Sequence, residues 1–144
     1  MGHNLYEMAD RIVAVLKPEF PKYTIERAGA LLHHVDQVYD RLPAIWVAPG
    51  PMERDGDALS QNFLLDQEWS VSLVLPTAEP IRGIDAGTVL FQLITVLDGW
   101  RVQMDSAHTV FLRFSGAGAP EFDRGTVSYP ATFTTRLPVT NKRT

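Results

Sequence analysis

The chain of 144 residues contains no cysteine. This absence excludes disulfide bonds, thiolate zinc sites, iron–sulfur clusters and a cysteine nucleophile. Positive charge is also scarce, because 13 basic residues against 17 acidic ones leave a formal net charge of −4. This balance argues against a protein that binds nucleic acid by neutralising phosphates. Long apolar runs are missing too, since the most apolar stretch, 86–97, is shorter than the about 20 residues of a membrane-spanning helix.

The remaining composition is that of a globular protein, with 45% hydrophobic and 21% charged residues. Chains usually divide into separate domains only at roughly twice this length, so we expect one domain over residues 1–144. The first apolar run, 12–16, is too short for a signal peptide. We therefore expect the protein to be made in a reducing cytoplasm.

An amphipathic helix is predicted over residues 5–16, because its apolar residues recur at spacings of three and four. Asn4 and Glu7 have the spacing of a capping box, which would satisfy free amides of the first turn. Lys17 precedes Pro18, and a residue before proline is disfavoured in the helical region. The helix is therefore expected to end there.

Two further helices are indicated. Residues 30–41 form a second amphipathic segment. Residues 85–98 form a third, with Asp85 as its N-cap and Gly99 after its last turn. This third helix is apolar around most of its circumference, so we expect it to be buried or packed on two partners.

A long strand is predicted over residues 61–75, where apolar and polar residues alternate. Fully extended, it would span roughly 50 Å, whereas a compact domain of this length is roughly 37 Å across. Either a bulge interrupts the strand, or its first half projects from the body as a hairpin arm. A projecting arm would expose backbone amides and invite pairing with a neighbouring subunit.

The other strands are shorter, and the last contains Pro130, which suits a sheet edge or a bulge. Their expected ranges are 23–28, 44–48, 109–115 and 126–137. The resulting order is α, β, α, β, β, α, β, β. It indicates an α+β fold with an antiparallel or mixed sheet and helices packed on one face.

Two loops are predicted from their glycine, proline and charge content. The first covers 49–57, where four charged side chains leave little to pack. The second is a flexible loop that combines 116–120 with 123–125. The alternative interpretation of both loops is that they are solvated, mobile connections between strands.

No catalytic motif stands out. His33, His34 and Asp36 have the composition of a metal site, but adjacent helical residues point about 100° apart and cannot face one ion together. Asp66 and Glu68 share a strand face, which more often means a solvated face than an acid–base pair. The three tryptophans are interpreted as core or interface anchors. We expect no catalytic residue, metal ligand or cofactor site.

Read in order, several segments resemble a known family. They are LPAIWVAPG at 42–50, QEWSVSLVLP at 67–76, DAGTVLFQLITVLDGW at 85–100 and YPATFTTRLPV at 129–139, after an N-terminal amphipathic helix. Together they resemble the phage tail terminators of the Mu-type small tail protein family, which share a fold with minor tail protein U and resemble tail-tube proteins. The resemblance covers most of the chain and rests on the order of the segments.

The resemblance implies a structural role without enzymatic activity. Such proteins form a hexameric ring that caps the tail tube, ends its polymerisation and offers a surface to the neck or head. The implied partners are further copies of the chain, the tube protein, a neck or head-completion protein and, in contractile phages, the sheath protein. DNA would only pass through the lumen, and no membrane is involved. The implied location is the tail–neck junction of the virion, reached from the host cytoplasm during assembly.

Two groups of residues are the candidate contacts with neighbouring subunits or the tube. The first lies on the expected arm, and the second lies in the second loop. They are Glu53, Arg54, Asp55, Asp57 and Phe63 for the arm, and Glu121, Asp123 and Arg124 for the loop. The alternatives are a tail-completion, neck or tube protein of the same particle, or a small α+β enzyme or ligand-binding domain.

Overall fold

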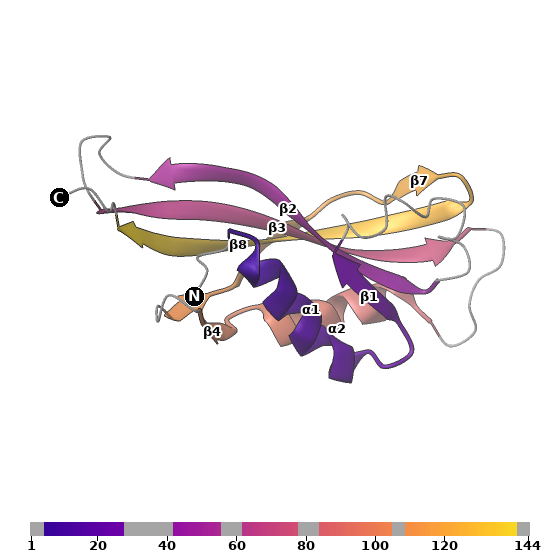
Figure 1. Cartoon of the computed structure of the whole chain (residues 1–144). Coiled ribbons are helices and arrows are strands. Elements are labelled where there is room, and N and C mark those ends of the chain that lie inside the picture. Colours follow the sequence, from indigo (N-terminus) through magenta and orange to yellow (C-terminus); the bar gives the residue numbers. More distant parts are fainter. Residues whose placement is uncertain (1–4, 28–41, 56–61, 78–83, 105–108, 141–144) are drawn as a thin grey trace.

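Long strands that run almost the full length of the molecule dominate the computed structural model, which describes residues 5–27, 42–55, 62–77, 84–104 and 109–140 (Figure 1). Within these ranges two helices lie on one face of a six-stranded sheet, beside a small two-stranded sheet. The elements are α1 (Glu7–Glu19), β1 (Thr24–Arg27), β2 (Ala44–Asp55), β3 (Asn62–Pro76), α2 (Ala86–Leu97), β4 (Arg101–Gln103), β5 (Thr109–Phe111), β6 (Arg113–Ala117), β7 (Glu121–Asp123) and β8 (Thr126–Thr140). The expected α+β fold is confirmed.

The sheet is mixed but mostly antiparallel. Its strand order is β1-β2-β3-β8-β6, and β7 also pairs with β8. Only β1 and β2 run parallel. The central pair, β3 and β8, stays in one register from Asn62↔Thr140 to Pro76↔Thr126.

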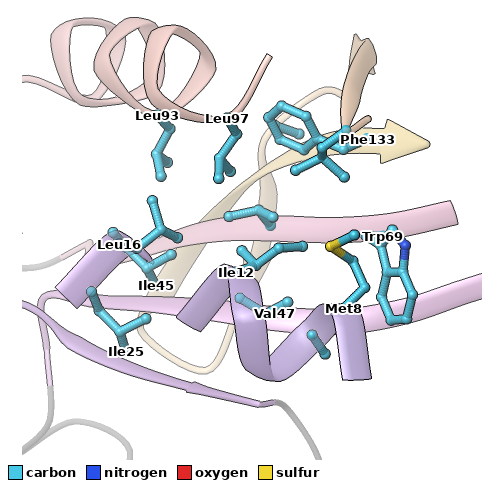
Figure 2. Close-up of a cluster of buried hydrophobic side chains, with 14 of the residues drawn as sticks. Met8, Ile12, Leu16, Ile25, Ile45, Val47, Trp69, Leu93, Leu97 and Phe133 are labelled. Atoms are coloured by element: carbon cyan, nitrogen blue, oxygen red, sulfur yellow. The ribbon is translucent and has the colours of Figure 1, made fainter. Parts of the chain in front are cut away.

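The core lies between the helices and one face of the sheet, which we call the helix face. Alternation in β3 sends Trp69, Val71 and Leu73 to this face, and all three are fully buried. Each helix adds one buried stripe to the core, as Figure 2 shows for Leu93 and Leu97 of α2. The opposite face of the sheet is called the outer face.

The first helix differs from its prediction at both ends. Its N-cap is Tyr6, which makes no side-chain cap hydrogen bond, and Asn4 lies outside the described residues. The helix also continues through Pro18 to Glu19. The last turn closes because the Phe20 amide donates to the Leu16 carbonyl at 3.0 Å, and Phe20 is buried in the core.

The helix α2 begins and ends as predicted. The Asp85 side chain accepts from the Thr88 amide, and Gly99 has a positive φ of 77°. The helix packs against both α1 and the sheet. Its far side remains open, however, because Phe91 is 69% exposed. The predicted helix at 30–41 lies outside the described residues.

The predicted loop at 49–57 is wrong up to Asp55, because this segment continues β2. Gly50 and Pro51 form a bulge opposite Glu68. A Cβ at position 50 would lie 3.0 Å from the Cβ of Glu68, so the close strand approach requires glycine. Prolines are tolerated here because β1 pairs with β2 only as far as Val47.

Of the two alternatives for the long strand, the projecting arm is the one realised. β3 pairs with β8 without a bulge, and the ends of β2, β3 and β8 extend past the helices (Figure 1). The bulge lies in the neighbouring strand β2. This extension consists of residues 49–55, 62–67 and 135–140, and we call it the arm. It has three strands, where the sequence predicts a two-stranded hairpin.

Two details of the C-terminal half also differ from the predictions. The strand predicted at 109–115 is divided at Leu112, and its two parts, β5 and β6, belong to different sheets. At the division, the Leu112 amide donates to the Trp100 carbonyl and the Leu112 carbonyl accepts from the Gly99 amide. Pro130 lies in an interior strand, because β8 pairs on both sides. Proline is tolerated because position 130 of β8 pairs with neither β6 nor β7. The Pro130 carbonyl accepts from the Gly118 amide at 3.1 Å.

A buried polar network fixes the root of the arm. The Trp69 indole N–H donates to the Thr135 hydroxyl at 3.1 Å, and this hydroxyl donates to Oε1 of Gln67 at 3.2 Å. The Gln67 amide donates to the Leu5 carbonyl at 3.0 Å. Gln67 and Thr135 are 2% and 3% exposed. The network therefore ties the start of α1 to β3 and β8 where the arm leaves the body.

We expect Thr135→Val to lower the free energy of unfolding by about 1–3 kcal/mol, because it leaves the Trp69 N–H and the Gln67 oxygen without partners. Thr134→Val is the matched control, since its side chain lies on the outer face and its effect should stay within about 0.5 kcal/mol. Urea denaturation measures both. Equal losses in the two variants would contradict this role of the network.

Candidate assembly surfaces

Within the described part of the chain, the candidate contact residues lie on β2, β3, β7 and the turn after β7. In this part of the chain, no group of three His, Asp or Glu residues is arranged to hold a metal ion. None of the helices described is long and apolar enough to cross a membrane. His33, His34 and Asp36 lie outside the described residues. Asp66 shares its strand face with Glu68 as predicted, but it faces Arg136 across the strands.

The outer face of the arm is charged. Arg136 of β8 lies 3.2 Å from Asp55 of β2 and 2.9 Å from Asp66 of β3. The contact with Asp66 lacks hydrogen-bond geometry and is an ion pair only. All three side chains are at least 40% exposed, so each pair contributes about 0–1 kcal/mol. The pairs bridge the three arm strands and contribute little to stability.

The candidate residues of the arm divide between its two faces. Glu53 and Asp55 lie on the outer face, since they alternate with Arg54 along β2 and Glu53 pairs with Asp66. Arg54 lies on the helix face, with its guanidinium 4.1 Å from the ring centroid of Phe63. The sequence places these residues in a loop, but the structure places them on a strand. Asp57 lies outside the described residues.

The helix face of the arm is apolar beyond the end of the helical layer. Phe63 and Leu65 of β3 lie opposite Val139 and Leu137 of β8, and all four are half-buried. We call these four residues the arm surface. Its apolar character could be predicted from the alternation, but its position beyond the helices could not.

Proline reduces pairing along the free edge of β8. The Pro130 carbonyl points toward the β6 side, and backbone groups alternate along a strand, so Arg136 and Pro138 point the same way. No described strand pairs with β8 on this side beyond Thr134. Because Pro138 has no N–H, a strand added here would lose a hydrogen bond. The arm is therefore better suited to contacts through its faces than to edge pairing.

The opposite end of the sheet carries the second candidate group. Residues 121–123 form β7, and a tight turn at Arg124 and Gly125 connects it to β8. Both turn residues have positive φ, 48° and 83°, as a type I′ hairpin turn requires. The loop predicted here is right for 118–120 and for the turn at Arg124 and Gly125, but 116–117 belong to β6 and Asp123 belongs to β7. Glu121, Asp123 and Arg124 are all exposed on it.

Phe122 is the feature of this end that the sequence interpretation missed. It is 74% exposed, and it pairs with Val127 on the helix face. It borders a hollow of about 380 Å³ whose lining is mostly apolar and comprises Leu75, Pro76, Thr77, Ile84, Asp85, Ala86, Val127 and Tyr129. We call Phe122 and this hollow the hairpin surface. A single aromatic residue between two acids has no periodicity, so pattern analysis assigned it to a loop.

The two candidate groups are far apart within one chain. The arm lies where Asn62 pairs with Thr140, and the hairpin lies where Pro76 pairs with Thr126. These pairs are the two ends of the same strands, separated by roughly 50 Å. The two surfaces can therefore meet only between different copies of the chain.

Asp85, beside the hairpin surface, provides a pH-dependent contribution to stability. The pKa of its carboxyl lies below the ordinary value, because it accepts hydrogen bonds from the Thr88 hydroxyl at 2.6 Å and the Thr88 amide at 3.2 Å. The unfolded chain therefore binds this proton more readily than the folded one. The contribution is present above the ordinary carboxyl pKa of 3.8 and is lost as the pH falls through the lower pKa of the folded state.

Asp85→Asn keeps an N-cap acceptor but does not titrate. We expect the thermal unfolding midpoint of this variant to change less with pH than that of the wild type below about pH 4. Thermal unfolding followed by circular dichroism at a series of pH values measures the difference. Parallel pH profiles for the two proteins would contradict the role of the cap.

Comparison with known proteins gives one family match. The model of the family described as phage tail terminator protein matches residues 11–143, nearly the whole chain. No curated protein matches the sequence. The matched range contains β2, β3, α2 and β8, and therefore both the arm and the hairpin. The chain belongs to the phage tail terminator family, a family of structural proteins, as the order of its segments indicated.

Proposed function

We propose that copies of this chain form a ring that caps the tail tube, ends its polymerisation and offers the attachment surface for the neck or head. Membership of the tail terminator family supports a structural tail-completion role. The observation that carries the ring is the separation of two unlike candidate surfaces to opposite ends of one sheet. Unlike surfaces at opposite ends join copies head to tail, which produces rings when the rotation closes.

The arm supports contact with a second kind of partner. It extends beyond the helical layer, and its faces differ, with charged residues on the outer face and apolar ones on the helix face (Figure 1). A ring subunit needs a lateral contact and a separate face toward the last tube ring. We assign the charged outer face, with Glu53 and Asp55, to the tube or the neck. The sheath protein is a further partner in a contractile tail.

DNA would pass through such a ring without being held. The outer face carries small hydroxyl residues along its middle, where Ser70 and Ser72 of β3 alternate with the buried residues. The net charge of −4 per copy also disfavours binding to phosphates. The proposed location is the tail–neck junction of the virion.

Enzymatic activity has less support than a structural role. Acid–base catalysis commonly uses groups with shifted pKa values grouped in one pocket. Among the described residues, a shifted pKa is found for Tyr23, where burial raises it, and for Asp85, where hydrogen bonds lower it. The cap role of Asp85 accounts for its shift, and Tyr23 does not line the hollow beside Asp85.

Electron microscopy of particles made without this protein tests the function. We expect over-long tails without heads, because nothing would stop the tube or connect it to the neck. Expression of the wild-type chain in the same cells should restore tails of normal length. Normal tails joined to heads in the deleted phage would contradict the proposal, and long filaments of the purified chain alone would indicate a tube protein instead.

A further inference from the structure

The arm has two free edges, one along β2 and one along β8. β1 pairs with β2 only as far as Val47, and β6 pairs with β8 only between Ala131 and Thr134. No other described strand continues the sheet at these edges, and the arm extends past the helices, which leave both edges uncovered (Figure 1). An unpaired edge presents backbone N–H and C=O groups with which a strand of another molecule can pair.

On the β2 edge, the first outward-facing donor past β1 is missing. The Thr24 amide donates to the Pro43 carbonyl at 3.0 Å, so the backbone groups of Pro43 point toward β1. Backbone groups alternate along a strand, and Pro49 therefore points to the same side. Proline has no N–H, and the bulge at Gly50 and Pro51 breaks the regular spacing directly beyond it. A strand added here would meet an incomplete and irregular row of donors.

The β8 edge is interrupted in a similar way. The Pro130 carbonyl accepts from the Gly118 amide on the β6 side. Alternation along β8 then points the backbone groups of Arg136, Pro138 and Thr140 to the free edge. Pro138 is the middle one of these three and has no N–H. A strand laid along this edge would lose a hydrogen bond at its centre.

Both prolines face outward, where they leave the pairing inside the arm intact. The register of β3 with β8 is continuous through Pro138, and Pro49 still lies opposite Trp69 of β3. Tolerance of proline at a sheet edge explains why it can stand at these positions. The loss of a donor on each side has a further effect, because it opposes pairing at both edges of the arm at once.

We propose that Pro49 and Pro138 block strand addition at the two edges of the arm, so that copies of this chain do not join into a continuous β-sheet. Addition of the β2 edge of one copy to the β8 edge of the next is a head-to-tail contact, and it builds an open filament when the rotation does not close. The proposal rests on the proposed function and deepens it, since a protein that ends the growth of one polymer must not form another by itself.

A double variant of the full chain tests the block. Pro49→Thr with Pro138→Thr restores an N–H at each edge without adding apolar surface, and threonine is favourable in strands. We expect β-rich filaments of this variant at a concentration roughly tenfold lower than for the wild type, because each strand-to-strand contact gains hydrogen bonds. Thioflavin T fluorescence and electron microscopy of the purified chain measure filament formation.

Pro120→Thr is the matched control, since it makes the same exchange at an exposed position outside the described strands and should behave as the wild type. Circular dichroism shows whether each variant is folded. A folded double variant that assembles no more readily than the wild type overturns the proposal. Equal assembly of Pro120→Thr and the double variant overturns it as well.

The single variants keep the proposal testable if the double variant does not fold. Pro49→Thr or Pro138→Thr opens one edge per copy, so two copies can join through like edges but no filament can grow. Sedimentation velocity should show added association in pairs for each single variant. Single variants that both sediment as the wild type does would overturn the block.

Failure of the block and failure of the function give different results. A folded double variant without added assembly, combined with over-long tails in phage without the protein, would overturn the block and leave the capping function intact. Filaments of the double variant, combined with normal tails in phage without the protein, would overturn the function and leave the block intact.

Discussion

The uninterrupted pairing of β3 with β8 is the constraint on which the rest of the structure depends. Fifteen residues of each strand stay in one register, so the sheet is longer than the two helices that cover it (Figure 1). A register slip of one residue would turn Trp69, Val71 and Leu73 to the outer face. The buried contact of Trp69 with Thr135 resists such a slip. The length of the sheet is therefore a fixed property of the fold.

This excess length leaves apolar residues beyond the helical layer at both ends. At one end they are the half-buried residues of the arm, and at the other they surround the exposed Phe122. Pro138 reduces backbone pairing along the free edge of β8. Side chains on the faces are thus the main means by which copies can join. A single strand pair provides both the scaffold and the separation of the two surfaces.

Much of the fold could be predicted from local patterns. The alternation at 61–75 located β3 within a residue at each end, and Asp85 and Gly99 located α2. The prediction failed where tertiary contacts override local preference. Proline and charge indicated a loop at 49–55, but that segment pairs with β3. Gln67, a polar residue at an apolar position of the alternation, was the available sign of the buried network. The exposure of Phe122 could not be predicted from the sequence, because it depends on how the short hairpin of β7 and β8 is placed at the end of the sheet.

The central claim is that copies of this chain form a single ring at the end of a tail tube. Cryo-electron microscopy of tubes assembled with this protein tests it most directly. The account predicts one additional ring at one end of each tube. Density for this protein along the length of the tube, or tubes without an additional ring at either end, would contradict the account.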